Sequence, residues 1–310
     1  MAKPAAALVL LVLLAVGCGP VEATTLRPLD GETVHVVATV GMVGDAVQRV
    51  GGERVAVETL MGPGIDPHVY KASEGDLRRL ERADVVFYVG LHLEARMAEV
   101  FERIGGARTT RAVGDAVPEA DRLAPPDFAG NYDPHIWFDV ELWRRAVLAI
   151  RDTLAERDPG SASLYGRNSA AYLDELDELD AYVQRRASEI PRERRVLITA
   201  HDAFNYFGRA YGFDVRGLQG ISTAAEAGAG DVQELADFIA ERRIPALFVE
   251  SSVSPRAIEA VREAVRARGF DVRRGGELFA DAMGEAGTPE GTYVGMVRHN
   301  IDVIVEGLGR

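Results

Sequence analysis

The stretch SASLYGRNSAAYLDELDELDAYVQRRASEI, residues 161–190, contains no proline and one glycine. Apolar residues recur through it at intervals of three, four and seven positions, and Asp and Glu fill the positions between them. These apolar residues are Tyr165, Tyr172, Leu176, Leu179 and Val183. Such spacing places them on one face of an α-helix. The stretch therefore predicts a single amphipathic helix of about 30 residues.

On both sides of this helix, short apolar runs alternate with amphipathic stretches. The runs predict strands over residues 35–40 (HVVATV), 55–61, 84–89 (DVVFYV), 196–200 (VLITA), 246–250 (ALFVE) and 271–274. The intervening stretches predict helices over residues 41–50, 73–83, 142–157, 231–242, 255–268 and 293–308. Alternation of this kind is typical of parallel sheets with crossover helices.

The order of these elements predicts an α/β protein with two lobes. Each lobe has a parallel sheet flanked by helices, and one long backbone helix joins the two. We expect the N-terminal lobe over residues 33–158, the linking helix over 159–190 and the C-terminal lobe over 191–310. A helix is a stiffer connection than a loop, so this architecture favours small movements between the lobes.

The N-terminus differs from the rest of the chain. Lys3 is followed by an apolar run over residues 5–16, then by Gly17 and Cys18. The run is shorter than the roughly 20 residues that a membrane-spanning helix needs, and its layout is that of a secretory signal peptide. We expect residues 1–17 to be the signal peptide and 18–32 a tether that begins with Cys18. This cysteine resembles the one that becomes lipidated in bacterial lipoproteins.

Composition excludes some classes of protein. A chain of 310 residues with 47% hydrophobic and 27% charged residues has the composition of a globular protein with room for two domains. The 35 Lys and Arg residues are outnumbered by 48 Asp and Glu residues, which gives a net charge of -13. This charge would repel a polyanion, so we expect no nucleic-acid partner.

Three histidines occupy comparable places. His68 ends the tripeptide Asp66-Pro67-His68 after the strand over 55–61, and His135 ends a second copy, Asp133-Pro134-His135. His201 directly follows the strand over 196–200. Ligands of open parallel sheets bind beyond the carboxyl ends of the strands, and proline restricts the backbone that presents each imidazole. The pattern favours a metal site built from imidazoles.

The other side chains that could bind a metal ion indicate which metals the site would suit. If lipidation uses Cys18, the mature chain has no thiol, and nitrogen with carboxylate oxygen suits zinc, manganese or ferrous iron. Asp281, in LFADAMG (residues 278–284), is the candidate carboxylate. Glu250, at the end of the strand over 246–250, is an alternative ligand or a partner that orients an imidazole. His92, after the strand over 84–89, is a further candidate ligand.

Four stretches together carry a resemblance to a known family. They are GPGIDPHVYKAS (62–73), DPHIWFD (133–139), HDAFNYF (201–207) and FADAMG (279–284). They resemble the ligand motifs of bacterial solute-binding protein family 9, the metal-binding lipoproteins of zinc and manganese ABC transporters. The resemblance implies that His68 and His135 from the first lobe, with His201 and Asp281 from the second, hold one divalent ion between the lobes.

The resemblance also implies the biological setting. Family members are helical-backbone metal receptors with restricted lobe movement, and they deliver the ion to an ABC transporter permease and its ATPase. We accordingly expect an exported monomer, held by its N-terminal lipid on the periplasmic or extracellular face of a bacterial membrane. Three imidazoles and one carboxylate are used by members that take zinc, manganese or iron, and zinc should bind most tightly in vitro.

Two other function classes are open from the residues. One is a lipid-anchored adhesin or interaction module with a structural metal, which would not exchange its ion. The other is a zinc hydrolase with Glu250 or Asp202 as general base. Four protein ligands would leave no open position for a catalytic water, and no His-Glu-x-x-His or Gly-x-Ser-x-Gly sequence occurs. We expect no enzymatic activity.

Overall fold

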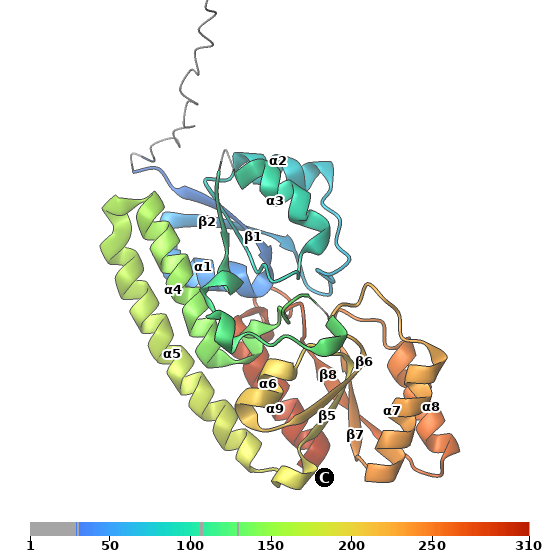
Figure 1. The fold of residues 1–310 in the computed structure, drawn as a ribbon. Helices are drawn as coiled ribbons and strands as arrows, with labels where there is room; N and C mark the ends of the chain where they lie inside the picture. Colours follow the sequence, from blue (N-terminus) through green and yellow to red (C-terminus); the bar gives the residue numbers. More distant parts are fainter. Residues whose placement is uncertain (1–28, 30, 106–107, 129, 310) are drawn as a thin grey trace, which may run out of the picture.

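The computed structural model describes residues 29, 31–105, 108–128 and 130–309. The predicted signal peptide, Cys18 and most of the predicted tether lie outside the described residues. Two α/β lobes stand one above the other in Figure 1, and a long helix, α5 (Ala162–Ser188), runs along both. The predicted fold class and the predicted long helix are confirmed.

The first lobe contains one parallel sheet of four strands in the order β2-β1-β3-β4. The strands are β1 (Val34–Val40), β2 (Val55–Met61), β3 (Val85–Tyr88) and β4 (Thr109–Ala112). Its helices are α1 (Gly41–Gly51), α2 (Glu74–Arg82), α3 (Ala98–Gly105) and α4 (Val140–Arg157). Val36 of the central strand β1 pairs with Val57 on one side and Val85 on the other. Val36 and Val85 are buried and Val57 is half-buried, and runs of such apolar residues predict the strands of this sheet from the sequence.

The second lobe contains two parallel pairs, β5-β6 and β7-β8, with β5 beside β7. The strands are β5 (Val196–His201), β6 (Asp214–Gln219), β7 (Ala246–Glu250) and β8 (Arg273–Leu278). The helices are α6 (Asn205–Tyr211), α7 (Ala229–Arg242), α8 (Arg256–Ala267) and α9 (Tyr293–Gly309). The last strand lies over 273–278 rather than the predicted 271–274. Two glycines, Gly275 and Gly276, obscured it in the sequence.

Helix α5 is bonded to both lobes. Tyr172 donates a hydrogen bond to Asp45 Oδ2 in α1 (3.4 Å), and Tyr182 donates one to Asp302 Oδ1 in α9 (2.7 Å). Its buried face is the apolar stripe predicted from the sequence, from Tyr165 to Val183. Helix α5 therefore contacts both lobes through hydrogen bonds and through its apolar face.

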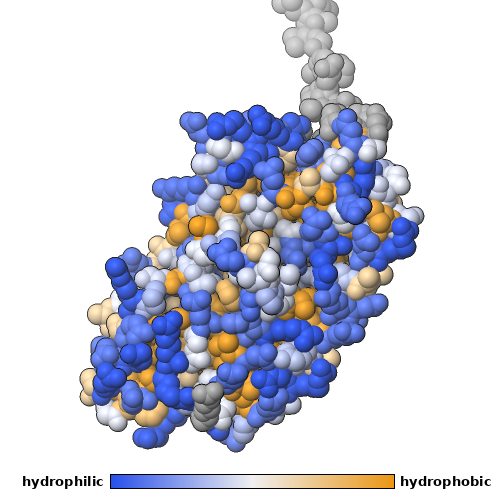
Figure 2. Space-filling view, turned by 180° about the vertical axis from the view of Figure 1, so that it is seen from behind, coloured by the Kyte–Doolittle hydropathy of each residue, from blue (hydrophilic) through white to orange (hydrophobic). Residues whose placement is uncertain are grey.

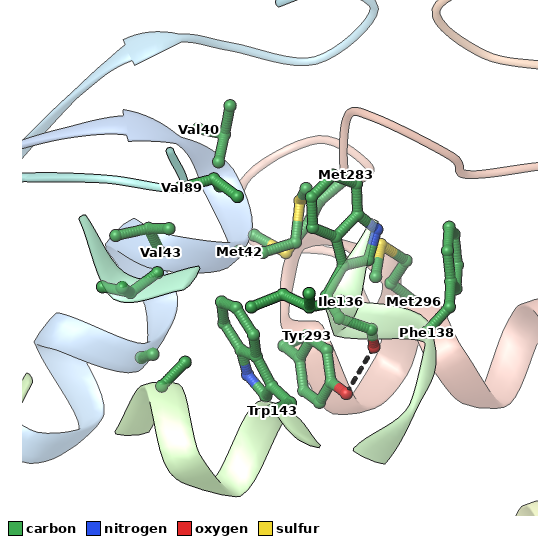
Figure 3. Packing of buried hydrophobic residues seen from close by; sticks show 14 of the residues in the cluster. Val40, Met42, Val43, Val89, Ile136, Phe138, Trp143, Met283, Tyr293 and Met296 are labelled. Atoms are coloured by element: carbon green, nitrogen blue, oxygen red, sulfur yellow. Dashed lines mark hydrogen bonds between the residues drawn. The ribbon is translucent and has the colours of Figure 1, made fainter. Parts of the chain in front are cut away.

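The lobes also share an apolar core. Figure 3 shows Met42 of the first lobe close to Met283 of the second, and Trp143 of α4 stacked on Tyr293 of α9 at 5.2 Å between ring centroids. In the same view the Tyr293 hydroxyl donates a hydrogen bond of 2.8 Å to the carbonyl of Trp137. A core that crosses between lobes resists large relative rotation, because close-packed interiors change shape only at a cost.

The outer surface is mixed in polarity. Figure 2 shows hydrophilic residues over most of one face, with hydrophobic residues interspersed among them. In the part of the chain that the structure describes, no helix is both long and apolar enough to cross a membrane. Ile65 and Val69 are exposed large hydrophobic residues in the loop between β2 and α2.

Candidate metal centre

The structure brings His68, His135, His201 and Asp281 into one buried cluster between the lobes. Each side chain comes from a different segment of the chain. His68 lies in the loop after β2, and His135 precedes a short 3-10 helix (Ile136–Phe138) that leads into α4. His201 is the last residue of β5, and Asp281 follows β8. Three of the four side chains therefore follow or end strands, as the parallel sheets predict, whereas His135 comes from the segment that leads into α4.

The donor atoms have the spacing of a metal site. The Nε2 atoms of His68 and His135 are 3.3 Å apart. The carboxylate oxygens of Asp281 lie 3.5 Å from His68 Nε2, 3.2 Å from His135 Nε2 and 3.2 Å from His201 Nε2. A tetrahedral ion with bonds of about 2.0–2.1 Å has its donor atoms about 3.3 Å apart. The cluster therefore fits one zinc-sized ion.

Several of these atoms have no other partner. His201 Nε2 and both carboxylate oxygens of Asp281 are buried and make no hydrogen bond within the described residues. Buried polar atoms without a partner cost free energy. A bound cation would satisfy all three atoms at once, so the donor set suits a divalent ion.

Asp133 orients His135. Its Oδ1 atom accepts hydrogen bonds from the backbone N–H of His135 (3.0 Å) and from Nδ1 of the same residue (2.7 Å). Its Oδ2 atom accepts a bond of 3.2 Å from Asn205 at the start of α6. Because Nδ1 carries the proton in this arrangement, Nε2 presents its lone pair to the cluster.

Glu250 orients His201 in the same way. Its Oε2 atom lies 2.5 Å from His201 Nδ1, and its Oε1 atom accepts the backbone N–H groups of Ala200 (2.7 Å) and His201 (2.9 Å). Glu250 ends β7 and His201 ends the neighbouring strand β5. Glu250 contacts Nδ1 of His201, whereas Nε2 of the same ring faces Asp281. Of the two roles expected for Glu250, ligand or orienting partner, this geometry is that of the orienting partner.

His68 is held differently. Asp66 Oδ1 accepts its backbone N–H at 2.9 Å, but no carboxylate is found at Nδ1 of His68 within the described residues. The other oxygen of Asp66 accepts a hydrogen bond of 2.6 Å from the Thr223 hydroxyl in the second lobe. The two Asp-Pro-His copies therefore share the backbone bond and differ in how the imidazole is supported.

With this geometry established, comparison with known proteins identifies the family. The model of the family described as zinc-uptake complex component A periplasmic matches residues 36–307. The chain belongs to this family. The match confirms the family that the four motifs of the sequence predicted.

Individual relatives cover nearly the whole chain. The zinc-binding protein TroA of Treponema pallidum is 53% identical over 281 residues, which are 91% of this chain and 90% of the relative. The manganese-binding lipoprotein MntA of Bacillus subtilis is 46% identical over 292 residues, 94% of each chain. A solved structure of the periplasmic zinc-binding protein TroA from Treponema pallidum superposes with a TM-score of 0.88 and covers 90% of this chain and all of its own.

In this member of the zinc-uptake component A family, the three imidazoles of the cluster differ in pKa. Burial alone would lower the pKa of His135, but Asp133 and Asp281 raise it to about 9. Burial likewise opposes charge on His201, and Glu250 with Asp281 raises its pKa well above the usual range. Burial dominates at His68, whose pKa falls to about 3. Without metal, protons on His135 and His201 offset part of the negative charge of the buried carboxylates beside them.

His92 lies outside the cluster of four. It is exposed in the turn after β3, with a backbone φ of +76°, and its ring makes an edge contact with Phe128 at 6.2 Å between centroids. The neighbouring Glu94 is buried and accepts a hydrogen bond from Thr39 (2.6 Å) and the N–H of Val89 (2.8 Å). This turn is therefore fixed by Glu94, and the structure does not bring His92 to the other imidazoles.

Three further residues shape the site through contacts that the sequence alone did not assign. Asp133 was noticed as part of Asp-Pro-His, and its place two residues before His135 was the available signal. Trp137 donates from Nε1 to the carbonyl of Ala280 (3.1 Å), which fixes the backbone beside Asp281. Thr223 carried no signal, because it contacts Asp66 only through the fold.

Proposed function

We propose that this chain is an extracytoplasmic solute-binding lipoprotein that binds one divalent transition-metal ion and delivers it to an ABC transporter permease and its ATPase. The observation that carries the proposal is the buried cluster of three imidazoles and one carboxylate with tetrahedral spacing. Membership of the zinc-uptake component A family supports the transport role. In this proposal the metal is cargo.

The proposed ligands are His68, His135, His201 and Asp281. Asp133 and Glu250 would keep the Nε2 lone pairs of His135 and His201 aimed at the ion and raise their basicity. Both oxygens of Asp281 face imidazoles, so the carboxylate can bind through one oxygen or both. A site with three nitrogens and an adaptable carboxylate accommodates zinc, manganese or ferrous iron.

Zinc should bind most tightly, since affinities at nitrogen and oxygen sites rise from manganese through iron to zinc. One relative is named for zinc and another for manganese. Supply and release rates outside the membrane, rather than affinity alone, would then decide which ion is carried.

A binding role fits the site better than catalysis. The four proposed ligands complete a tetrahedron, whereas catalytic zinc keeps a position for water. Glu250, the base expected in a hydrolase, is engaged by His201 Nδ1 and two backbone N–H groups. We infer that the chain is not an enzyme.

For the setting of the molecule, we propose removal of residues 1–17 and lipid attachment at Cys18. The mature protein would be a monomer with lobes at 33–158 and 191–310 joined by 159–190. A relative named as a lipoprotein covers 94% of this chain, which supports the anchor. A Cys18→Ala variant should then move from the membrane fraction to the soluble extracytoplasmic fraction.

The experiment that tests the function is metal analysis of the protein purified without its signal peptide, followed by competition between zinc and manganese. We expect one equivalent of metal and a large rise in thermal stability that a chelator reverses. Absence of metal and of any stabilisation by divalent ions would contradict the site. It would leave the adhesin or interaction module as the better interpretation.

A further inference from the structure

The interface between the lobes differs from one side of the metal cluster to the other. On the α6 side several hydrogen bonds cross it. They run from Asn205 to Asp133 Oδ2 (3.2 Å), from Tyr206 to the carbonyl of Asp133 (3.1 Å) and from Arg209 to the carbonyl of Asp121 (2.7 Å). This side is held by bonds that do not involve the four clustered residues.

On the opposite side, segment 62–72 carries His68 toward the second lobe. Apart from the cluster itself, the hydrogen bond that joins this segment to the second lobe in the described part of the chain is Thr223 Oγ1 to Asp66 Oδ2, at 2.6 Å. The other oxygen of Asp66 accepts the backbone N–H of His68 at 2.9 Å. One carboxylate therefore links the second lobe to the backbone of a proposed ligand.

Release of an ion requires part of this interface to move. The four clustered side chains are no more than 3% exposed, so an ion among them has no open path to solvent. His201 ends a strand, and His135 leads into a capped helix, where Asp139 accepts the N–H groups of Glu141 and Leu142. Segments 62–72 and 220–228 contain no helix or strand. Segments of this kind open at lower free energy than strands and helices.

We propose that the Thr223–Asp66 hydrogen bond is a latch that sets the rate at which the metal ion leaves the site. The inference rests on the proposed function. Thr223 is a positioning residue: it touches no metal, and it acts through Asp66 on the backbone of His68. Breaking the bond frees segment 62–72 to swing away with His68, while His135, His201 and Asp281 stay in place.

The test uses Thr223→Val, which removes the hydroxyl and preserves the shape of the side chain. Protein loaded with Zn²⁺ is mixed rapidly with excess chelator, and release is followed in time. We expect release about tenfold faster than in the wild type, because a hydrogen bond to a charged group is lost. The visible spectrum of the Co²⁺-loaded variant should equal that of the wild type, since the donor atoms are unchanged.

Two matched variants sharpen the result. Thr223→Ser keeps a hydroxyl and should restore slow release. Ser222→Ala removes the neighbouring hydroxyl, which accepts a bond of 3.3 Å from the N–H of Ala224 within the same loop, and should leave release unchanged. The proposal is overturned by wild-type release in Thr223→Val, by equally fast release in Ser222→Ala, or by shifted Co²⁺ bands in Thr223→Val.

A second measurement needs no metal and separates the latch from the proposed function. Failure of the wild type to bind Zn²⁺ or Co²⁺ would refute the function, whereas the latch also predicts hydrogen exchange in the metal-free protein. The N–H of His68 should exchange several-fold faster in Thr223→Val, with no change in α5. Equal exchange at His68 in both proteins would refute the latch, whatever the metal content.

Discussion

The imidazoles of the metal cluster differ in how firmly they are held: His135 and His201 form one half of the comparison, and His68 the other. His135 and His201 are each fixed by a carboxylate on Nδ1, from Asp133 and Glu250, and are wholly buried. Within the described residues, His68 has no carboxylate at Nδ1; its backbone N–H bonds to Asp66, and it lies in a loop where Ile65 and Val69 are about 40% exposed. His135 and His201 are therefore the fixed half of the cluster, whereas the position of His68 depends on its loop.

The difference shows how a tight site can still release its ion. If all four side chains were fixed by partners of their own, opening would require the shared core to move. Placing one proposed ligand on a loop confines the movement to a few residues. The core that crosses between the lobes can then stay closed throughout.

The largest expected contrast concerns metal-free stability. His135→Ala leaves the buried carboxylate of Asp133 without a countercharge, removes one of the two charged imidazoles beside Asp281, and should lower the free energy of unfolding by about 3–5 kcal/mol. His68→Ala removes an imidazole that is neutral at pH 7 and should cost about 1 kcal/mol. Urea unfolding with a chelator present measures both. Both variants should lose metal binding. An equal loss of free energy of unfolding in the two variants would contradict the proposed difference between His135 and His68.

An intermediate effect is expected at the orienting carboxylates. Glu250→Gln preserves shape and removes the charge that supports His201, so zinc affinity should fall about 10- to 100-fold. Titration against a chelator of known affinity measures the change. The matched control is Glu306→Gln on the exposed side of α9, which should bind zinc like the wild type. Unchanged affinity in Glu250→Gln would show that His201 needs no orienting partner.

The pH dependence of zinc affinity should come from His135 and His201 and not from His68. The raised pKa of His135, about 9 against an ordinary 6.5, means that zinc must displace its proton below pH 9. Zinc affinity should therefore rise with pH, by up to about tenfold per unit for each proton displaced.

The same shift works in the opposite direction on the metal-free protein. Stability from protonated His135 is complete below its ordinary pKa of 6.5 and is lost as pH rises toward about 9. His68, with a pKa of about 3, contributes no proton in this range. Calorimetry of zinc binding in buffers of different ionisation enthalpy counts the released protons. Affinity that is flat from pH 6 to 8 would contradict the charge distribution.

Local pattern predicted much of the fold. The long helix was identified from apolar spacing and appears at Ala162–Ser188, and the buried valines of β1 identified the first sheet. Strand β6 (Asp214–Gln219) and helix α6 (Asn205–Tyr211) were missed. β6 is only partly buried and mixes charge with glycine, so its strand conformation depends on pairing with β5. Helix α6 is too short for its periodicity to be read.

The sequence alone determined which residue types form the buried cluster. The repeated Asp-Pro-His, the histidine at a strand end and the carboxylate of Asp281 are local features. Strand polarity places the segments after β2 and β8 and the last residue of β5 at the carboxyl ends of their sheets. The tertiary structure decided how each side chain is used. Glu250 reaches Nδ1 of His201 because β7 lies beside β5, and Thr223 reaches Asp66 across 157 positions of the chain. Contacts between distant segments depend on packing, and no local pattern encodes them.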